Sequence, residues 1–374
     1  MSVFRGARKG KDAMNGLHDY ILWLGEFDFT AVPFREADAV ILCLLTYCDF
    51  TPLFEHSDEA LLRDCQGLID AGEVHIQRIG KAEPFIQILE AAANSRRFGT
   101  LRMTGYVDIM LPRGPIQFSA ITYHSDAGWS FIAYRGTDSS LAGWKEDFMI
   151  SFKRTEAQEL ALQYAEDRIN SERAWYLGGH SKGGNLALYA TCMLPEDKRA
   201  SIARMYLLDG PGFCPEVIDP EIVGKVKPLV TRIIPGFSII GKLFDPRIEL
   251  TRIVQSSASG FLQHDPATWG IDHGKLALLP QTAPHSDIIN AILGKWIGGL
   301  ACEEREVFIN DIFDALGAGG AETIEALEAQ GLKAYEAISA RLRNSSEITK
   351  RTLRSLSYQA IQAIRDALFH KPEV

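Results

Sequence analysis

Ser181 is flanked by glycines in the run Gly179-His180-Ser181-Lys182-Gly183, where a short apolar segment gives way to a helical one. In a strand–turn–helix arrangement of this kind, the serine sits on a strained turn that exposes its hydroxyl and requires small neighbours such as Gly179 and Gly183. The turn also places the serine at a helix N-terminus, where the helix dipole favours a developing negative charge. We therefore expect Ser181 to be a nucleophile for acyl transfer, with the backbone N–H of Lys182 directed at the oxyanion. The alternative is a glycine-rich turn whose serine is idle.

A second oxyanion donor is expected from a loop that follows an earlier strand. The apolar run that ends at Tyr134-Arg135 leads into Gly136 and Thr137. Gly136 permits a sharp bend, and Thr137 offers both its N–H and its hydroxyl to an oxyanion. His180 is expected to be a structural residue of the turn, with its ring packed beneath the nucleophile.

A serine nucleophile needs a histidine base, which follows the nucleophile along the chain in the fold that this turn indicates. Four of the nine histidines do so: His264, His273, His285 and His370. His264 is favoured because it comes shortly after a strand-like run, 247–254. His285 is the alternative base, unless it caps a helix that begins near Asp287. The other two are expected to lie on the surface.

Asp209 is the favoured acid to orient the imidazole and stabilise its charged form. It directly follows the buried run Met205–Leu208 and precedes Gly210-Pro211-Gly212. Asp245, Asp265 and a serine or backbone orienter are the alternatives. Asp209 would then only be a turn former before the Gly-Pro-Gly sequence.

The elements that must position these residues alternate between strand and helix. Helical patterns are expected at 156–171 and 183–193, and a hairpin turn is expected at Ser125–Gly128. Strands are expected at 116–123, 129–134, 174–178, 204–208, 230–234 and 247–254. This alternation predicts an α/β fold with a mainly parallel sheet.

Helical patterns also dominate both ends of the chain. Residues 15–75 read as mostly helical, with Asn15 and Asp58 as expected N-caps, and the chain is helical almost throughout from Ile288 onward. Residues from Lys333 carry more Lys and Arg than Asp and Glu. These C-terminal helices are expected to present a solvated face, with a partner, a second copy or a membrane surface as the alternative.

Composition excludes several classes of function. The 374 residues are 46% hydrophobic and carry a net charge of -9, which favours a globular protein and disfavours a nucleic-acid binder. No apolar run reaches the length of a membrane span, and no signal peptide is expected after the basic N-terminus. The six cysteines form no CxxC pair and are expected to be buried thiols in the cytoplasm. No metal or cofactor motif is present, so neither a metal nor a cofactor is expected.

Three motifs together resemble those of the fungal-type class 3 lipases: Tyr134-Arg135-Gly136-Thr137-Asp138, Trp144-Lys145-Glu146-Asp147 and Gly179-His180-Ser181-Lys182-Gly183-Gly184. The resemblance implies that Thr137 lines the oxyanion hole and that the Trp-x-x-Asp element supports its loop. In those lipases the acid follows the next-to-last strand. Here that strand leads into Pro235-Gly236-Phe237-Ser238, which holds no carboxylate, so the chain departs from the lipase pattern.

The chain more closely resembles an uncharacterised bacterial family of lipase-like α/β-hydrolases. That family has a lysine after the nucleophile, a helical lead-in and a segment like Gln263-His264-Asp265-Pro266. The resemblance spans residues 15 to 315. Together with the helical patterns at both ends, it predicts an N-terminal helical lead-in or cap at 1–99 and an α/β-hydrolase core at 100–315. A C-terminal helical extension is expected at 316–374, outside the resemblance.

The expected activity is hydrolysis of a carboxylic or lipid ester through an acyl-Ser181 intermediate. The substrate would be a small acyl compound, and 213–227 is the candidate lid. The alternative function is a non-catalytic binding or regulatory module on the same scaffold, which the missing carboxylate after the next-to-last strand motivates.

Overall fold

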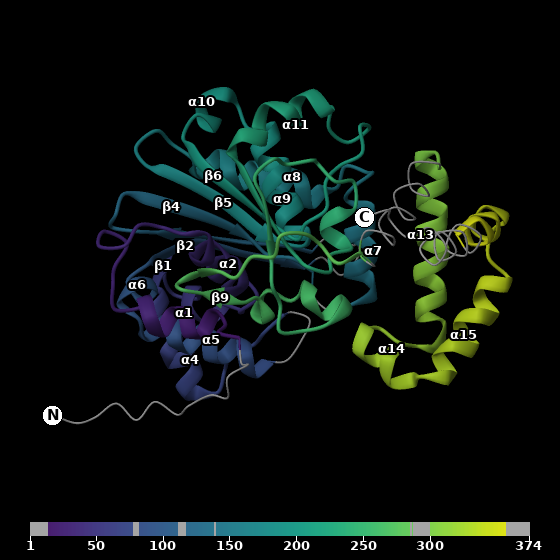
Figure 1. The fold of residues 1–374 in the computed structure, drawn as a ribbon, viewed down its shortest axis with the longest axis horizontal. Helices are drawn as coiled ribbons and strands as arrows, with labels where there is room; N and C mark the ends of the chain where they lie inside the picture. The colour runs from purple at the N-terminus through teal and green to yellow at the C-terminus, as the bar shows by residue number, and fades with distance from the viewer. Residues whose placement is uncertain are drawn as a thin grey trace, which may run out of the picture.

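A central sheet of eight strands organises the protein, in the order β1-β2-β3-β4-β5-β6-β7-β8 (Figure 1). The computed structural model describes residues 14–77, 82–110, 117–137, 140–284, 286 and 300–356. Asp138, His285, Asp287 and His370 of the sequence predictions lie outside these ranges. The strands are β1 (Glu59–Leu61), β2 (Arg102–Met110), β3 (Gln117–His124), β4 (Trp129–Tyr134), β5 (Ala174–His180), β6 (Ile202–Leu208), β7 (Val230–Pro235) and β8 (Thr251–Val254).

The sheet changes from antiparallel to parallel at β4. Strands β1 to β4 pair antiparallel, whereas β4 to β8 pair parallel. The residues of β4 and β7 are all buried, as expected of parallel strands that are covered on both faces. Because parallel strands end at the same edge, the loops after β4 to β8 meet there.

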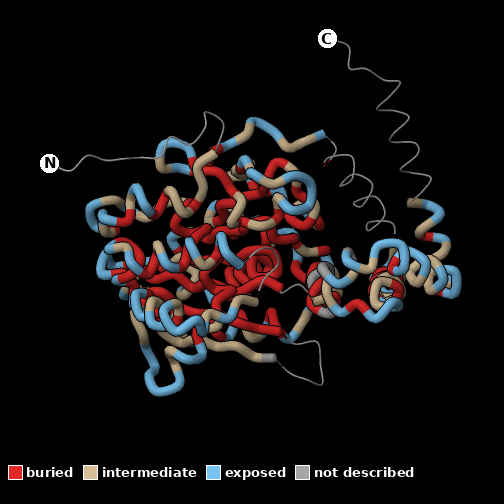
Figure 2. Tube along the Cα trace, turned by 90° about the horizontal axis from the view of Figure 1, so that it is seen from below, coloured by how far each residue is buried: buried red, intermediate tan, exposed pale blue. Residues whose placement is uncertain are grey.

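Helices cover both faces of the sheet, in agreement with the predicted α/β-hydrolase fold (Figures 1 and 2). One face packs against α7 (Leu141–Met149), α8 (Glu156–Arg168), α9 (Lys182–Met193) and α11 (Pro220–Val226), and α13 (Cys302–Leu316) packs against α7. The other packs against α1 (Leu17–Leu24), α2 (Glu36–Leu45), α4 (Cys65–Ala71), α5 (Ala82–Asn94) and α6 (Arg96–Gly99).

Helix α2 is central to the second layer because it is buried almost all round. Every residue from Ala37 to Leu45 is buried, which is typical of a helix that lies inside a core. The one carboxylate in this stretch, Asp38, forms an ion pair with Arg97 at 2.6 Å, and both side chains are fully buried. The N-terminal helices therefore share a continuous core with the sheet.

The remaining elements are short or lie at the periphery. They are α3 (Thr51–Phe54), α10 (Glu196–Arg199), α14 (Ile324–Gln330), α15 (Leu332–Arg343), a helical segment at 347–356, and the paired strands β9 (Ile271–Asp272) and β10 (Lys275–Leu276). Short 3-10 helices are η1 (Leu62–Asp64), η2 (Lys227–Leu229), η3 (Ile240–Lys242), η4 (Gly260–His264), η5 (Pro266–Thr268) and η6 (Gly317–Gly319). Helices α13, α14 and α15 lie to one side of the layers (Figure 1). No helix among the described residues is both long and apolar enough to span a membrane.

Both expected N-caps are wrong. Asn15 forms a β-bridge with Ile271, and Gly16 occupies the N-cap of α1. Asp58 precedes β1, a strand that pairs with β2, and the helical pattern there begins only at η1 and α4. Long-range pairing therefore overrides local helical spacing in this segment.

Other expected elements differ mainly in their ends. Strand β2 was not expected at all, β5 continues to His180, and α8 ends at Arg168. The run 247–254 becomes a strand only from Thr251, because Arg247 has a φ of 51°, outside the extended region, and the chain bends at 249–250. The cysteine prediction is confirmed for Cys43, Cys48, Cys65, Cys192 and Cys214, which are free and buried.

Candidate active site

Ser181 directly follows β5 and occupies the N-cap position of α9, with φ 56° and ψ −123°. A non-glycine residue in this region is strained by about 1–3 kcal/mol, so the surrounding structure must hold it there. The close packing explains the neighbouring glycines. A Cβ on Gly183 would lie 2.1 Å from the Tyr134 carbonyl oxygen, and one on Gly179 would lie 2.2 Å from the carbonyl carbon of Gly183.

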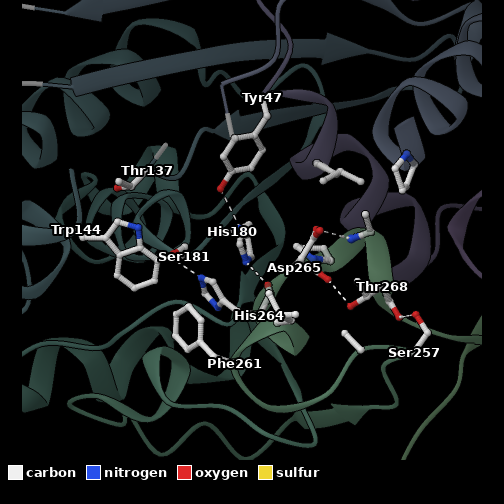
Figure 3. A pocket seen from close by; sticks show the side chains of 16 residues that line it. Tyr47, Thr137, Trp144, His180, Ser181, Ser257, Phe261, His264, Asp265 and Thr268 are labelled. Atoms are coloured by element: carbon white, nitrogen blue, oxygen red, sulfur yellow. Dashed lines mark hydrogen bonds between the residues drawn. The ribbon is translucent and has the colours of Figure 1, made fainter. Parts of the chain in front are cut away.

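The structure brings Ser181, His264 and Asp209 into one hydrogen-bonded chain, although they are far apart in sequence. The Ser181 Oγ lies 3.0 Å from His264 Nε2 (Figure 3), and on the other side of the ring His264 Nδ1 lies 2.6 Å from Asp209 Oδ2. They follow β5, β8 and β6 at one edge of the sheet. A neutral imidazole that donates from Nδ1 to the carboxylate leaves Nε2 free to accept the serine proton.

Asp209 is fixed by contacts on both sides of its carboxylate. Its Oδ1 accepts a hydrogen bond from the hydroxyl of Ser238 at 2.5 Å, and its backbone N–H donates to Ile233. The residue is 1% exposed and has a φ of 43°. Ser238 follows β7, where the class 3 lipases would have their acid. The sequence predictions did not name Ser238 as the partner of Asp209, although its position after that strand was a usable signal.

The alternative acids and bases in the described residues are engaged elsewhere. Asp245 pairs with Arg232 at 3.2 Å, and the side chain of Asp265 accepts from the N–H of Ala267. His273 is exposed and lies 2.6 Å from Asp272. None of these contacts links them to Ser181.

A second chain of hydrogen bonds connects the N-terminal helices to His264. His180 Nε2 lies 2.8 Å from the carbonyl oxygen of His264, and His180 Nδ1 lies 2.9 Å from the hydroxyl of Tyr47 (Figure 3). Because a neutral imidazole carries only one N–H, His180 donates from Nε2 and Tyr47 donates to Nδ1. The two imidazole rings lie 4.4 Å apart, centroid to centroid. Sequence spacing offered no signal for Tyr47, which lies 133 positions before His180.

The side chain of Lys182 is bound within the protein. Its Nζ donates to Glu146 and to the carbonyl oxygen of Gln117, each at 2.8 Å, and both members of the ion pair are buried. Burial raises the pKa of Glu146, although the charge of Lys182 opposes the effect. As the first residue of α9, Lys182 has a backbone N–H without an acceptor inside the helix.

Contacts with neighbouring segments fix the loop after β4. Arg135 makes two hydrogen bonds to Asp108, at 2.7 and 2.8 Å. A Cβ on Gly136 would lie 2.1 Å from the Tyr47 hydroxyl, so only glycine allows this approach. The buried Thr137 lies on the wall of the same cavity as Ser181.

A cavity of about 480 Å³ opens in front of Ser181 and is mainly apolar. Phe261 and Leu262 line it and are also exposed, by 38% and 62%, which places them where the cavity meets solvent. Its other lining residues are Leu44, Tyr47, Pro84, Thr137, Trp144, His180, Ser181, Ser257, Ala258, His264, Asp265, Pro266, Ala267 and Thr268. None comes from 213–227, so the segment expected as a lid does not line this cavity. In the described part of the chain, no cluster of His, Cys, Asp and Glu could hold a metal ion.

Comparison with known proteins identifies the family of this chain. No curated protein matches the chain. Among solved structures, the crystal structure of M37 lipase is similar, with 16% identity and a TM-score of 0.36, over 56% of this chain and 70% of that one. The model of the family described as Mbeg1-like matches residues 92–314, more than half of the sequence. The chain therefore belongs to the Mbeg1-like family.

Proposed function

We propose that the protein is a serine hydrolase that cleaves carboxylic esters through an acyl-Ser181 intermediate. The observation that carries the proposal is the unbroken chain from Ser181 Oγ through both nitrogens of His264 to Asp209. Since Asp209 reaches His264, the missing carboxylate after β7 no longer favours a non-catalytic module.

In the first half of the reaction, His264 Nε2 takes the hydroxyl proton as Ser181 Oγ attacks the ester carbonyl carbon. The C=O electrons move to oxygen, and the oxyanion accepts hydrogen bonds from the N–H of Lys182 and from Thr137. When the C–O bond breaks, imidazolium His264 gives its proton to the leaving alkoxide. Asp209 orients the ring and stabilises its charge.

In the second half, water takes the place of the alcohol. His264 removes one proton from the water as its oxygen attacks the acyl carbon, and the Ser181 ester bond then breaks. The proton returns to Ser181, and a carboxylic acid leaves. The enzyme ends the cycle in its starting protonation state.

The apolar wall of the cavity favours an ester with an apolar acyl group. Burial of each CH₂ contributes about 0.8 kcal/mol, so longer chains should bind better until the cavity is full. Phe261 and Leu262 at the opening would contact the part of the chain that extends outward. A lipid ester is the finer form of this proposal.

Two measurements test the proposal. Purified protein is treated with a fluorophosphonate probe, and hydrolysis of p-nitrophenyl esters from acetate to palmitate is measured in wild type and Ser181→Ala. We expect labelling and hydrolysis in the wild type alone. Equal rates in the two proteins, or labelling that does not depend on Ser181, would contradict the mechanism.

The division at residues 99 and 315, the cytoplasmic location and a partner or second copy bound by the C-terminal helices stay predictions. Removal of residues from about 320 onward, followed by oligomer and activity measurements, tests the last of these.

A further inference from the structure

Trp144 carries an indole N–H that no group of the described residues accepts. The residue lies on α7, lines the cavity together with Ser181 and Thr137, and is only 6% exposed. Its Nε1 atom is buried and has no hydrogen-bond partner among the described residues. A buried donor left without an acceptor costs about 1–3 kcal/mol, so its retention calls for a reason.

Other buried tryptophans show how the chain usually treats this group. Trp175 donates to the carbonyl oxygen of Asn170 at 3.0 Å, and Trp269 donates to that of Gln263 at 2.9 Å. Trp129 also has an unpartnered Nε1, but it belongs to the core beneath the N-terminal helices and does not line the cavity. Trp144 differs from all three because the residue that carries the unpartnered donor lines the cavity in front of the nucleophile.

The indole ring is held in place from several sides. Its centroid lies 5.2 Å from that of Phe261 and 6.3 Å from that of His264, and the backbone N–H of Trp144 donates to Ser140. Two residues further along α7, Glu146 is fixed by its ion pair with Lys182. In Figure 3 the indole nitrogen is on the side of the ring that faces Ser181 and Thr137.

We propose that the indole N–H of Trp144 donates a hydrogen bond to the acyl oxygen of the substrate as that oxygen becomes negative. It would be a third oxyanion donor beside the N–H of Lys182 and Thr137, and the inference rests on the function proposed above. The buried donor gains its acceptor only when the carbonyl oxygen becomes the oxyanion. The unfavourable burial in the free protein is then relieved in the tetrahedral intermediate.

The kinetic test compares Trp144→Phe with the matched control Trp129→Phe. Each substitution removes a buried, unpartnered N–H and keeps an aromatic ring, but only the first changes the cavity. We expect Trp144→Phe to lower kcat for p-nitrophenyl ester hydrolysis roughly 10-fold or more, with KM almost unchanged. Trp129→Phe should keep the wild-type kcat, and both variants should unfold near the wild-type temperature. A wild-type kcat in Trp144→Phe, or a change confined to KM, would overturn the inference.

A second measurement uses the wild-type protein and so does not depend on the folding of a variant. The indole ¹⁵N–¹H resonances are recorded with and without an alkyl boronic acid, which forms a tetrahedral adduct with a serine Oγ. Single Trp→Phe variants at the other tryptophans assign the Trp144 signal by elimination. We expect the Trp144 proton to move downfield in the adduct, and an unmoved signal would overturn the proposal.

Failure of this inference is distinguishable from failure of the proposed function. If Ser181 takes up neither fluorophosphonate nor boronic acid, the hydrolase proposal itself is wrong. If Ser181 reacts while the Trp144 signal and the Trp144→Phe kcat stay at their wild-type values, only the third donor is wrong.

Discussion

Ser238 donates its hydroxyl hydrogen to Oδ1 of Asp209 at 2.5 Å, while Oδ2 of the same carboxylate accepts from His264. The carboxylate thus comes from the loop after β6 and its support from the loop after β7. A hydrogen bond to a charged acceptor is worth about 1.5–3 kcal/mol, enough to fix the orientation of a buried carboxylate.

Loss of the Ser238 hydroxyl should slow catalysis without unfolding the protein. In Ser238→Ala, Asp209 keeps His264 but loses its second partner, so we expect kcat to fall by roughly a factor of 10. The matched control is Ser151→Ala, because Ser151 is a buried serine whose hydroxyl has no partner among the described residues. Ester hydrolysis and thermal unfolding are measured for both. Equal kcat values in the two variants would mean that Ser238 does not position the acid.

Replacement of Asp209 tests the identity of the acid. Asp209→Asn keeps the shape of the side chain but removes the acceptor that selects the Nδ1–H form of His264. We therefore expect kcat to fall by about 10⁴, because the wrong tautomer of His264 cannot accept the Ser181 proton. Asp245→Asn is the control, since Asp245 pairs with Arg232 and should leave kcat unchanged. A larger loss in Asp245→Asn than in Asp209→Asn would reverse the assignment.

The buried pair of Lys182 and Glu146 predicts a pH-dependent contribution to stability. Burial raises the pKa of Glu146 above its ordinary value of 4.5, so the folded protein binds this proton more tightly than the unfolded chain does. The contribution of Glu146 to the free energy of unfolding should therefore be largest below pH 4.5 and fall as the pH rises through the raised pKa.

Glu146→Gln isolates this effect because it removes the titrating group. The free energy of unfolding of the wild type minus that of Glu146→Gln is measured from acid to neutral pH, and we expect the difference to decrease as the pH rises. Glu306→Gln, which removes an exposed partner of Lys153, should give a small and nearly constant difference. A Glu146 difference that grows with pH would show that attraction to Lys182 outweighs burial.

Tyr47 should affect catalysis although it lies outside the Ser181–His264–Asp209 chain. In Tyr47→Phe, Nδ1 of His180 loses the hydroxyl that donates to it. The tautomer with its proton on Nε2, which donates to the carbonyl oxygen of His264, is then no longer favoured. We expect kcat to fall by roughly a factor of 10 with little change in stability. Tyr20→Phe is the control. Its hydroxyl donates to Asp38 within the N-terminal helices, so its loss should lower the unfolding temperature and leave kcat unchanged. Equal kcat values in the two variants would contradict the role of Tyr47.

The sequence was most informative where chemistry is local. The turn around Ser181 needs small residues on both sides, and the buried runs before Ser181 and Asp209 predicted strands that the structure contains. Because parallel strands end at one edge, the meeting of Ser181, Asp209 and His264 could be anticipated from their positions after those strands. The same alternation predicted an α/β fold with a mainly parallel sheet, and the motifs around Ser181 with their family resemblance made the expected fold an α/β-hydrolase.

Contacts that depend on tertiary packing were not predictable in this way. Glu59–Leu61 has too few residues to show a strand period, and only its pairing with β2 makes it extended. Tyr47 lies within 15–75, which read as mostly helical, and nothing in its spacing placed it beside His180. The ion pair of Lys182 was not predictable either, because its partner Glu146 lies on another helix. The sequence showed Lys182 only as the residue after the nucleophile.

The contact of Tyr47 with His180 sets a lower limit on the smallest active unit of the protein. A fragment cut to the family match at 92–314 would lack Tyr47, Leu44 and Pro84, and with them one wall of the cavity. It would also lose the helix that is buried against the centre of the sheet. The segment by which the family is recognised and the segment needed for turnover are therefore expected to differ, and expression of a minimal enzyme should begin well before residue 47.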